Sequence, residues 1–143
     1  MSAKDIFHDI VKVALQREQW IITHDPLRIK FGDVNFQIDL GAERLIAAER
    51  GKEKIAVEIK SFLNPSAITD FYAALGQFLS YRLALLEREP DRILYMAVPL
   101  ETYQTFFQLD FTQISLFYHS QNSKIVRNYH KCYPESDCER FYC

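Results

Sequence analysis

The stretch Lys54-Ile-Ala-Val-Glu-Ile-Lys60 decides the fold, because it has the alternation of a strand with two different faces. Successive side chains of a strand point to opposite sides of its sheet. One side therefore carries only aliphatic residues, namely Ile55, Val57 and Ile59. The other side carries Glu58 and Lys60. Burying such charges costs on the order of several kcal/mol unless they are paired or bind a metal, so the pattern predicts a functional site on a core strand.

The residues before this strand predict its neighbours. Apolar residues alternate with polar ones from Val34 to Leu40, which predicts a strand with Asp39 at its end, on the polar face. Residues 45–49 and 54–60 are separated by the turn-like Arg50-Gly-Lys52 and predict a β-hairpin. The segment 20–22 fits a short strand or a buried connection.

Helical spacing indicates two long helices. Residues 4–18 predict an amphipathic helix whose apolar side consists of Ile6, Ile10, Val13 and Ala14, widened by Phe7 and Val11. A second helix is expected to begin at Asn64-Pro65, as N-cap and first-turn proline, and to end before Pro90. Its expected apolar positions are Ile68, Phe71, Leu75, Phe78, Leu79, Leu83 and Leu86.

The apolar run 93–98 predicts a strand buried on both faces, parallel to the strand 54–60 across the long helix. A shorter helix over 99–109 and strands at 114–118 and 124–129 are expected to follow. The order of helix, three strands, helix and strand predicts one α/β domain over residues 1–143, with an atypical polar tail from about residue 119.

Composition restricts the class of protein. Of 143 residues, 48% are hydrophobic and 25% are charged, which is typical of a globular chain. The net charge of −2 argues against indiscriminate binding of nucleic acid, although Lys12, Arg17, Arg28 and Lys30 could form a local basic patch or be scattered surface charges. No membrane-spanning run or signal peptide stands out, so a cytoplasmic location is expected. Cys132, Cys138 and Cys143 lack the close pair typical of zinc sites.

Two carboxylates and a lysine, Asp39, Glu58 and Lys60, are the groups expected in a site that binds a metal and a phosphate. Mg²⁺ prefers oxygen ligands and keeps several waters, so one or two carboxylates suffice, while a lysine can stabilise developing negative charge. The same residues on a solvated strand face, paired with neighbours, would produce the same sequence pattern. Structure must decide between the two.

Four further residues are candidates around this site. Gln77 and Tyr81 are four apart on the long helix and so share one helical face, where they could line the site or form an ordinary polar stripe. His8 and Asp9 of the first helix could contribute to its edge or lie on a solvated helix face.

Several motifs, taken in order, resemble the XisH family of cyanobacterial fdxN element excision controlling factors. They cover roughly residues 1–110: SAKDIFHD at 2–9, THDP at 23–26, IDLGAE at 38–43, LIAAE at 45–49, IAVEIKSF at 55–62, ALGQF at 74–78 and PDRILYMAVP at 90–99. The chain beyond about residue 112 departs from the usual ending of that family.

The resemblance implies a restriction-endonuclease-like αβββαβ core of the PD-(D/E)xK type, with a central mixed sheet flanked by helices. It implies that Asp39 and Glu58, with the carbonyl of Ile59, bind Mg²⁺ or Mn²⁺ and that Lys60 is the catalytic lysine. Gln77-x-x-x-Tyr81 resembles the Gln-xxx-Tyr element of the RecB-like branch. The implied role is programmed excision of a DNA element during heterocyst differentiation, with DNA, an XisI-like companion and a site-specific recombinase as partners. A non-catalytic adaptor with the same fold is the alternative.

Overall fold

The computed structural model describes residues 2–47 and 51–120. The chain begins with helix α1 (Ala3–Arg17) and continues through five strands and helix α2 to strand β6. The strands are β1 (Ile21–His24), β2 (Leu27–Phe31), β3 (Val34–Ile38), β4 (Leu40–Ala47) and β5 (Gly51–Ile59). The remaining elements are α2 (Ala67–Arg88), β6 (Arg92–Ala97), α3 (Leu100–Gln104), the 3₁₀ helix η1 (Phe106–Gln108) and α4 (Asp110–Ser120). The strand predicted at 124–129 and the cysteines lie outside the described residues.

Four strands form a central mixed sheet in the order β1-β4-β5-β6. β4 pairs with β5 in antiparallel fashion, with Leu40 opposite Val57, which confirms the predicted hairpin with longer strands. β5 and β6 are parallel, as expected for strands joined by a long helix. β2 and β3 pair only with each other and form a separate hairpin between β1 and β4.

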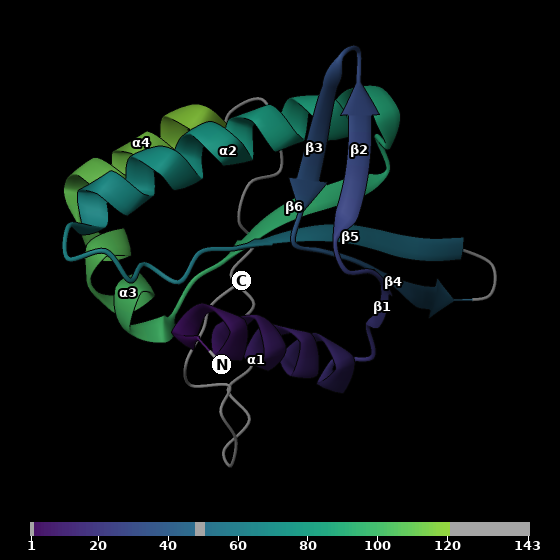
Figure 1. Cartoon of the computed structure of the whole chain (residues 1–143), viewed down its shortest axis with the longest axis horizontal. Helices are drawn as coiled ribbons and strands as arrows, with labels where there is room; N and C mark the ends of the chain where they lie inside the picture. Colours follow the sequence, from purple (N-terminus) through teal and green to yellow (C-terminus); the bar gives the residue numbers. More distant parts are fainter. Residues whose placement is uncertain (1, 48–50, 121–143) are drawn as a thin grey trace.

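Helices cover both faces of the central sheet (Figure 1). On one face, α1 contributes Phe7, Val11 and Leu15 to a core that includes Val57 and Ile59 of β5. On the other face, α2 and the β2–β3 hairpin enclose a second core. Its buried members are Leu27, Ile29, Ile38, Ala56, Phe78, Ala84, Leu85 and Leu94. The alternation predicted for β5 is therefore confirmed, since Val57 and Ala56 belong to different cores.

The predicted continuous strand from Val34 to Leu40 is wrong, because the chain changes sheet within it. β3 ends at Ile38 and β4 begins at Leu40, so that Asp39 lies at the break. Ile38 packs in the core under α2, whereas Leu40 packs in the core under α1. Alternation predicts the face of a residue only as long as the strand continues. Asp39 lies between two strands, so its face could not be predicted in this way.

The two predicted long helices are present, but the side that each one buries differs from the predicted side. Ile6 and Val13 are each 45% exposed, and α1 instead buries Leu15 beside Phe7, Val11 and Ala14. On α2, Leu83 and Leu86 are exposed, while Ala84 and Leu85 are buried under the hairpin. Each helix has more apolar residues than its contact with the sheet can bury. The sequence alone does not show which of these residues are buried.

The boundary of α2 also differs from the prediction. The helix begins at Ala67 after the N-cap Ser66, and Asn64 instead accepts a hydrogen bond from the Ser66 N–H at 2.9 Å, closing a turn before the helix. The helix predicted over 99–109 is divided into α3 and η1.

The strand predicted at 114–118 is wrong, because α4 covers these residues. Thr112 is buried, and Leu116 packs against the small core around Phe71 and Phe107. These two inward-facing residues are four apart, which is the spacing of a helix. Among residues 2–47 and 51–120, no helix has the length and apolar character needed to cross a bilayer.

Candidate metal and phosphate site

Glu58 is held at the centre of the sheet. β5 has β4 on one side and β6 on the other, with Glu58 opposite Met96 in the parallel register. Glu58 is only 6% exposed. The interpretation of Glu58 as part of a solvated strand face is therefore wrong, since α2 and the hairpin cover that face.

Asp39 and Glu58 meet through a reciprocal pair of hydrogen bonds. The Ile59 N–H donates to Asp39 Oδ2 at 2.8 Å, and the Asp39 N–H donates to Glu58 Oε2 at 3.3 Å. The carboxylate of each acid is thus held by a backbone N–H at or next to the other acid. The break between β3 and β4 makes this possible, because it frees the Asp39 N–H from strand pairing.

Burial and charge act together on the pair. Desolvation, followed by the negative charge of Asp39, raises the pKa of Glu58 to about 8. The ammonium of Lys60 acts in the opposite direction and lowers that pKa, so the lysine lies within electrostatic range of the pair. Lys60 itself is half-buried, one residue beyond the end of β5, and its N–H donates to the Ala97 carbonyl at 2.9 Å.

α2 carries the two polar side chains predicted to line this site, Tyr81 and Gln77. Burial, followed by the charges of Glu58 and Asp39, raises the pKa of Tyr81, so the phenol lies within electrostatic range of both acids. Gln77 is one helical turn away on the same face, and its Oε1 is buried without a hydrogen-bond partner among the described residues. An acceptor left in this state costs free energy unless a ligand or water supplies a donor.

His8 is bound elsewhere, and Asp9 is exposed on α1. His8 Nε2 lies 2.9 Å from Asp25 Oδ1, and Lys12 Nζ lies 2.7 Å from Asp25 Oδ2. The hydrogen bond to Asp25, and to a smaller extent the charge of Asp9, raises the pKa of Lys12. The structure therefore joins His8 and Lys12 to Asp25, in the connection between β1 and β2, and among the described residues no hydrogen bond or ion pair joins His8 or Asp9 to Asp39 or Glu58.

The donor set fits a hard divalent cation. The part of the chain that the structure describes holds no cluster of three or more His, Cys, Asp or Glu side chains. Two carboxylates that approach each other, with the predicted third donor in the Ile59 carbonyl, suit Mg²⁺ or Mn²⁺, which keep several water ligands. A cation between Asp39 and Glu58 would remove the repulsion that raises the pKa of Glu58.

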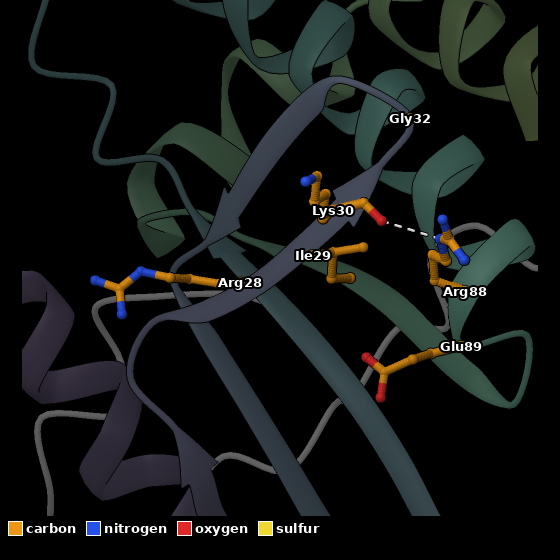
Figure 2. A pocket seen from close by; sticks show the side chains of 6 residues that line it. All are labelled: Arg28, Ile29, Lys30, Gly32, Arg88 and Glu89. Atoms are coloured by element: carbon orange, nitrogen blue, oxygen red, sulfur yellow. Dashed lines mark hydrogen bonds between the residues drawn. The ribbon is translucent and has the colours of Figure 1, made fainter.

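A basic pocket beside the hairpin was not predicted as a unit. It has a volume of about 400 Å³ and is lined by Arg28, Ile29, Lys30, Gly32, Arg88 and Glu89. Figure 2 shows it between β2 and the end of α2, where Arg88 Nε donates to the Lys30 carbonyl at 2.9 Å. One feature of the sequence indicates where Arg88 lies. It follows Tyr81 by seven residues, about two helical turns, and so lies on the same face of α2.

Comparisons with known proteins agree with the motifs. The family described as XisH protein matches residues 1–131, which extends past the 110 or so residues of the motif resemblance. No curated protein matches the chain.

Two crystal structures are similar to this chain at 51% sequence identity. One is an XisH family protein from Nostoc punctiforme, and the other is an fdxN element excision controlling factor protein from Anabaena variabilis. Each match covers 85% of this chain and 88% of the other, with a TM-score of 0.74. The family match, these two structures and the shared mixed α/β fold lead to one conclusion: the chain belongs to the XisH family.

Proposed function

We propose that this protein is a divalent-metal-dependent DNA endonuclease that acts in the excision of a DNA element. The observation that carries the proposal is the reciprocal hydrogen bonding of Asp39 and Glu58 in a covered site, with the charge of Lys60 beside them. The name of the Anabaena variabilis relative supports the biological context, because it describes that protein as an element excision controlling factor.

The side chains have distinct roles in this proposal. Asp39 and Glu58 would hold Mg²⁺ or Mn²⁺, which when bound supplies Lewis-acid stabilisation of a phosphate and activation of water. Lys60 orients the attacking water and stabilises negative charge that develops on the phosphate. The Gln77 amide, whose Oε1 is buried and meets no partner in the described part of the chain, orients the same water or a phosphate oxygen. Tyr81 closes the site from α2.

In this proposal the protein acts on DNA together with two other proteins. The substrate is DNA, and an XisI-like companion protein and a site-specific recombinase would complete the excision machinery. Hydrolysis of a phosphodiester by this chain would be one step, and strand exchange would belong to the recombinase.

A non-catalytic adaptor is the second candidate, and two observations favour it. The net charge is −2, which does not suit strong non-specific attraction to DNA. In addition, a pKa of about 8 allows Glu58 to be protonated near neutral pH, so the covered site can exist without a cation.

A plasmid-cleavage assay with Mg²⁺ or Mn²⁺ separates the two candidates. We expect wild-type protein to cut, and Lys60→Ala to cut about 100-fold more slowly or worse, because it loses a preorganised cation. Lys52→Ala is the matched control, since Lys52 is an exposed lysine of the same strand, β5, far from Glu58. A folded wild-type protein that binds an XisI-like companion but does not cut DNA would support the adaptor.

A further inference from the structure

The β2–β3 hairpin has one apolar face and one polar face. Leu27, Ile29 and Ile38 are buried against α2. The opposite face is formed by exposed side chains that stand opposite one another across the strands: Arg28 with Gln37, and Lys30 with Asn35. Between the strands, Gly32 has a φ of +59°, which suits a tight turn. The hairpin is thus a two-stranded ribbon with cations along β2 and amides along β3.

The cations of this ribbon are not neutralised. Across residues 2–47 and 51–120, neither Arg28 nor Lys30 forms a salt bridge with a carboxylate. Arg88 approaches β2 from the other side, where its Nε donates to the Lys30 carbonyl, while the side chains of Arg28 and Lys30 are directed away from it (Figure 2). The pocket's single acid, Glu89, lies 3.3 Å from the buried Arg92 guanidinium and is paired there. A local positive surface therefore exists on a chain whose net charge is −2.

The ribbon leads directly to the acidic site. β3 ends at Ile38, and the next residue is Asp39. At about 3.4 Å per residue, Gln37 and its partner Arg28 lie about 7 Å along the strand from Asp39, and Asn35 and Lys30 lie about 14 Å from it. On α2, Arg88 lies about 10 Å beyond Tyr81 along the helix axis, at 1.5 Å per residue.

We propose that the outer face of the β2–β3 hairpin, with Arg28 and Lys30, binds the sugar-phosphate backbone of duplex DNA and directs it to Asp39 and Glu58. The inference rests on the proposed function for the identity of its ligand. Arg28 and Lys30 are two residues apart on one face, a spacing of about 7 Å that equals two base-pair steps of a duplex. A two-stranded ribbon also fits the major groove, where the amides of Asn35 and Gln37 can hydrogen-bond to phosphates or base edges.

The test is binding of a fluorescently labelled duplex, measured by anisotropy over a range of salt concentrations with a chelator present. We expect the double substitution Arg28→Gln/Lys30→Gln to weaken binding at least about tenfold and to reduce the slope of log affinity against log salt by about 2. Arg17→Gln/Lys52→Gln is the control, because it removes two exposed cations from α1 and the far end of β5. It should leave both quantities near the wild-type values.

The outcomes distinguish this inference from the proposed function. A protein that binds DNA through the hairpin but never cuts it keeps the inference and refutes the nuclease. A protein that cuts while the Arg28/Lys30 variant binds like wild type, or like the Arg17/Lys52 control, refutes the inference alone. If polyglutamate competes as well as the duplex, the surface belongs to an acidic protein partner and the inference is overturned.

Discussion

The two faces of β5 show the difference between a packing surface and a candidate site. Toward α1, Val57 and Ile59 are buried among apolar side chains. Toward α2, Glu58 is just as buried but meets a second carboxylate, and its pKa is raised to about 8. Both faces are covered, so solvent exposure does not explain the polar residues on one of them. A covered carboxylate pair adds no hydrophobic stabilisation, which is why we assign it to function.

The same contrast exists between adjacent residues at the start of β4. Leu40 is fully buried in the α1 core, whereas Asp39 accepts a hydrogen bond from the Ile59 N–H and donates its own N–H to Glu58. The largest expected effect follows from this pair. We expect Leu40→Ala to reduce the free energy of unfolding by about 2–5 kcal/mol, because it opens a cavity in a core.

Asp39→Asn is the matched substitution, and it should change stability by less than about 1 kcal/mol, since the amide oxygen can still accept from the Ile59 N–H. It should instead abolish metal-dependent cleavage. Urea denaturation of both variants checks the comparison. Equal destabilisation by the two substitutions would show that Asp39 is a structural residue.

The second prediction concerns the pH dependence of stability. The folded-state pKa of Glu58 is about 8 and its ordinary value is 4.5, so between these values the folded protein holds a proton that the unfolded chain has lost. Wild-type stability should therefore fall as pH rises through this window, by up to about 1.4 kcal/mol for each pH unit.

Glu58→Gln has no such proton, so its curve should lack this contribution. Denaturant titrations without metal, at intervals of one pH unit between 4.5 and 8, measure the difference between the two proteins. Parallel curves would mean that Glu58 is ionised normally and that the two faces of β5 differ less than the structure indicates.

The smallest expected effect is on α2. Gln77→Leu should leave the free energy of unfolding within about 1 kcal/mol of wild type or raise it, because it removes a buried acceptor that has no partner within residues 2–47 and 51–120. Cleavage should become about tenfold slower if the amide orients water or a phosphate. Phe78→Ala, one residue away but in the hydrophobic core, should do the reverse and lower stability with little change in the activity of the folded protein. Both variants are compared by denaturation and by plasmid cleavage.

Much of the fold could be predicted where one periodicity holds along a whole element. The α1 helix, the β4–β5 hairpin, the long α2 helix and the parallel β6 strand follow from such runs. The β2–β3 hairpin was missed, although Leu27, Ile29 and Phe31 alternate with Arg28 and Lys30 before a Gly-Asp turn. Its first strand directly follows Asp25-Pro26, a dipeptide that is typical of a turn or loop.

The candidate site was predicted in part for the same reason. Glu58 belongs to one uninterrupted run, so its face of β5 could be deduced from alternation, whereas Lys60 follows the last residue of that strand. The position of Asp39 could not be deduced, because it lies where the chain passes from the hairpin into the central sheet. The burial of the Gln77 acceptor and the pocket around Arg88 depend on contacts between elements far apart in the sequence.

The sequence by itself determined which residues on β5 face the same way, which segments are helical and that the chain carries XisH motifs, because each of these depends on local spacing. Only the tertiary structure decided that the polar face of β5 is covered, that Asp39 reaches Glu58 and that the basic ribbon begins beside the acids. These features depend on which elements pack together, and packing is set by the sum of many weak contacts between distant residues.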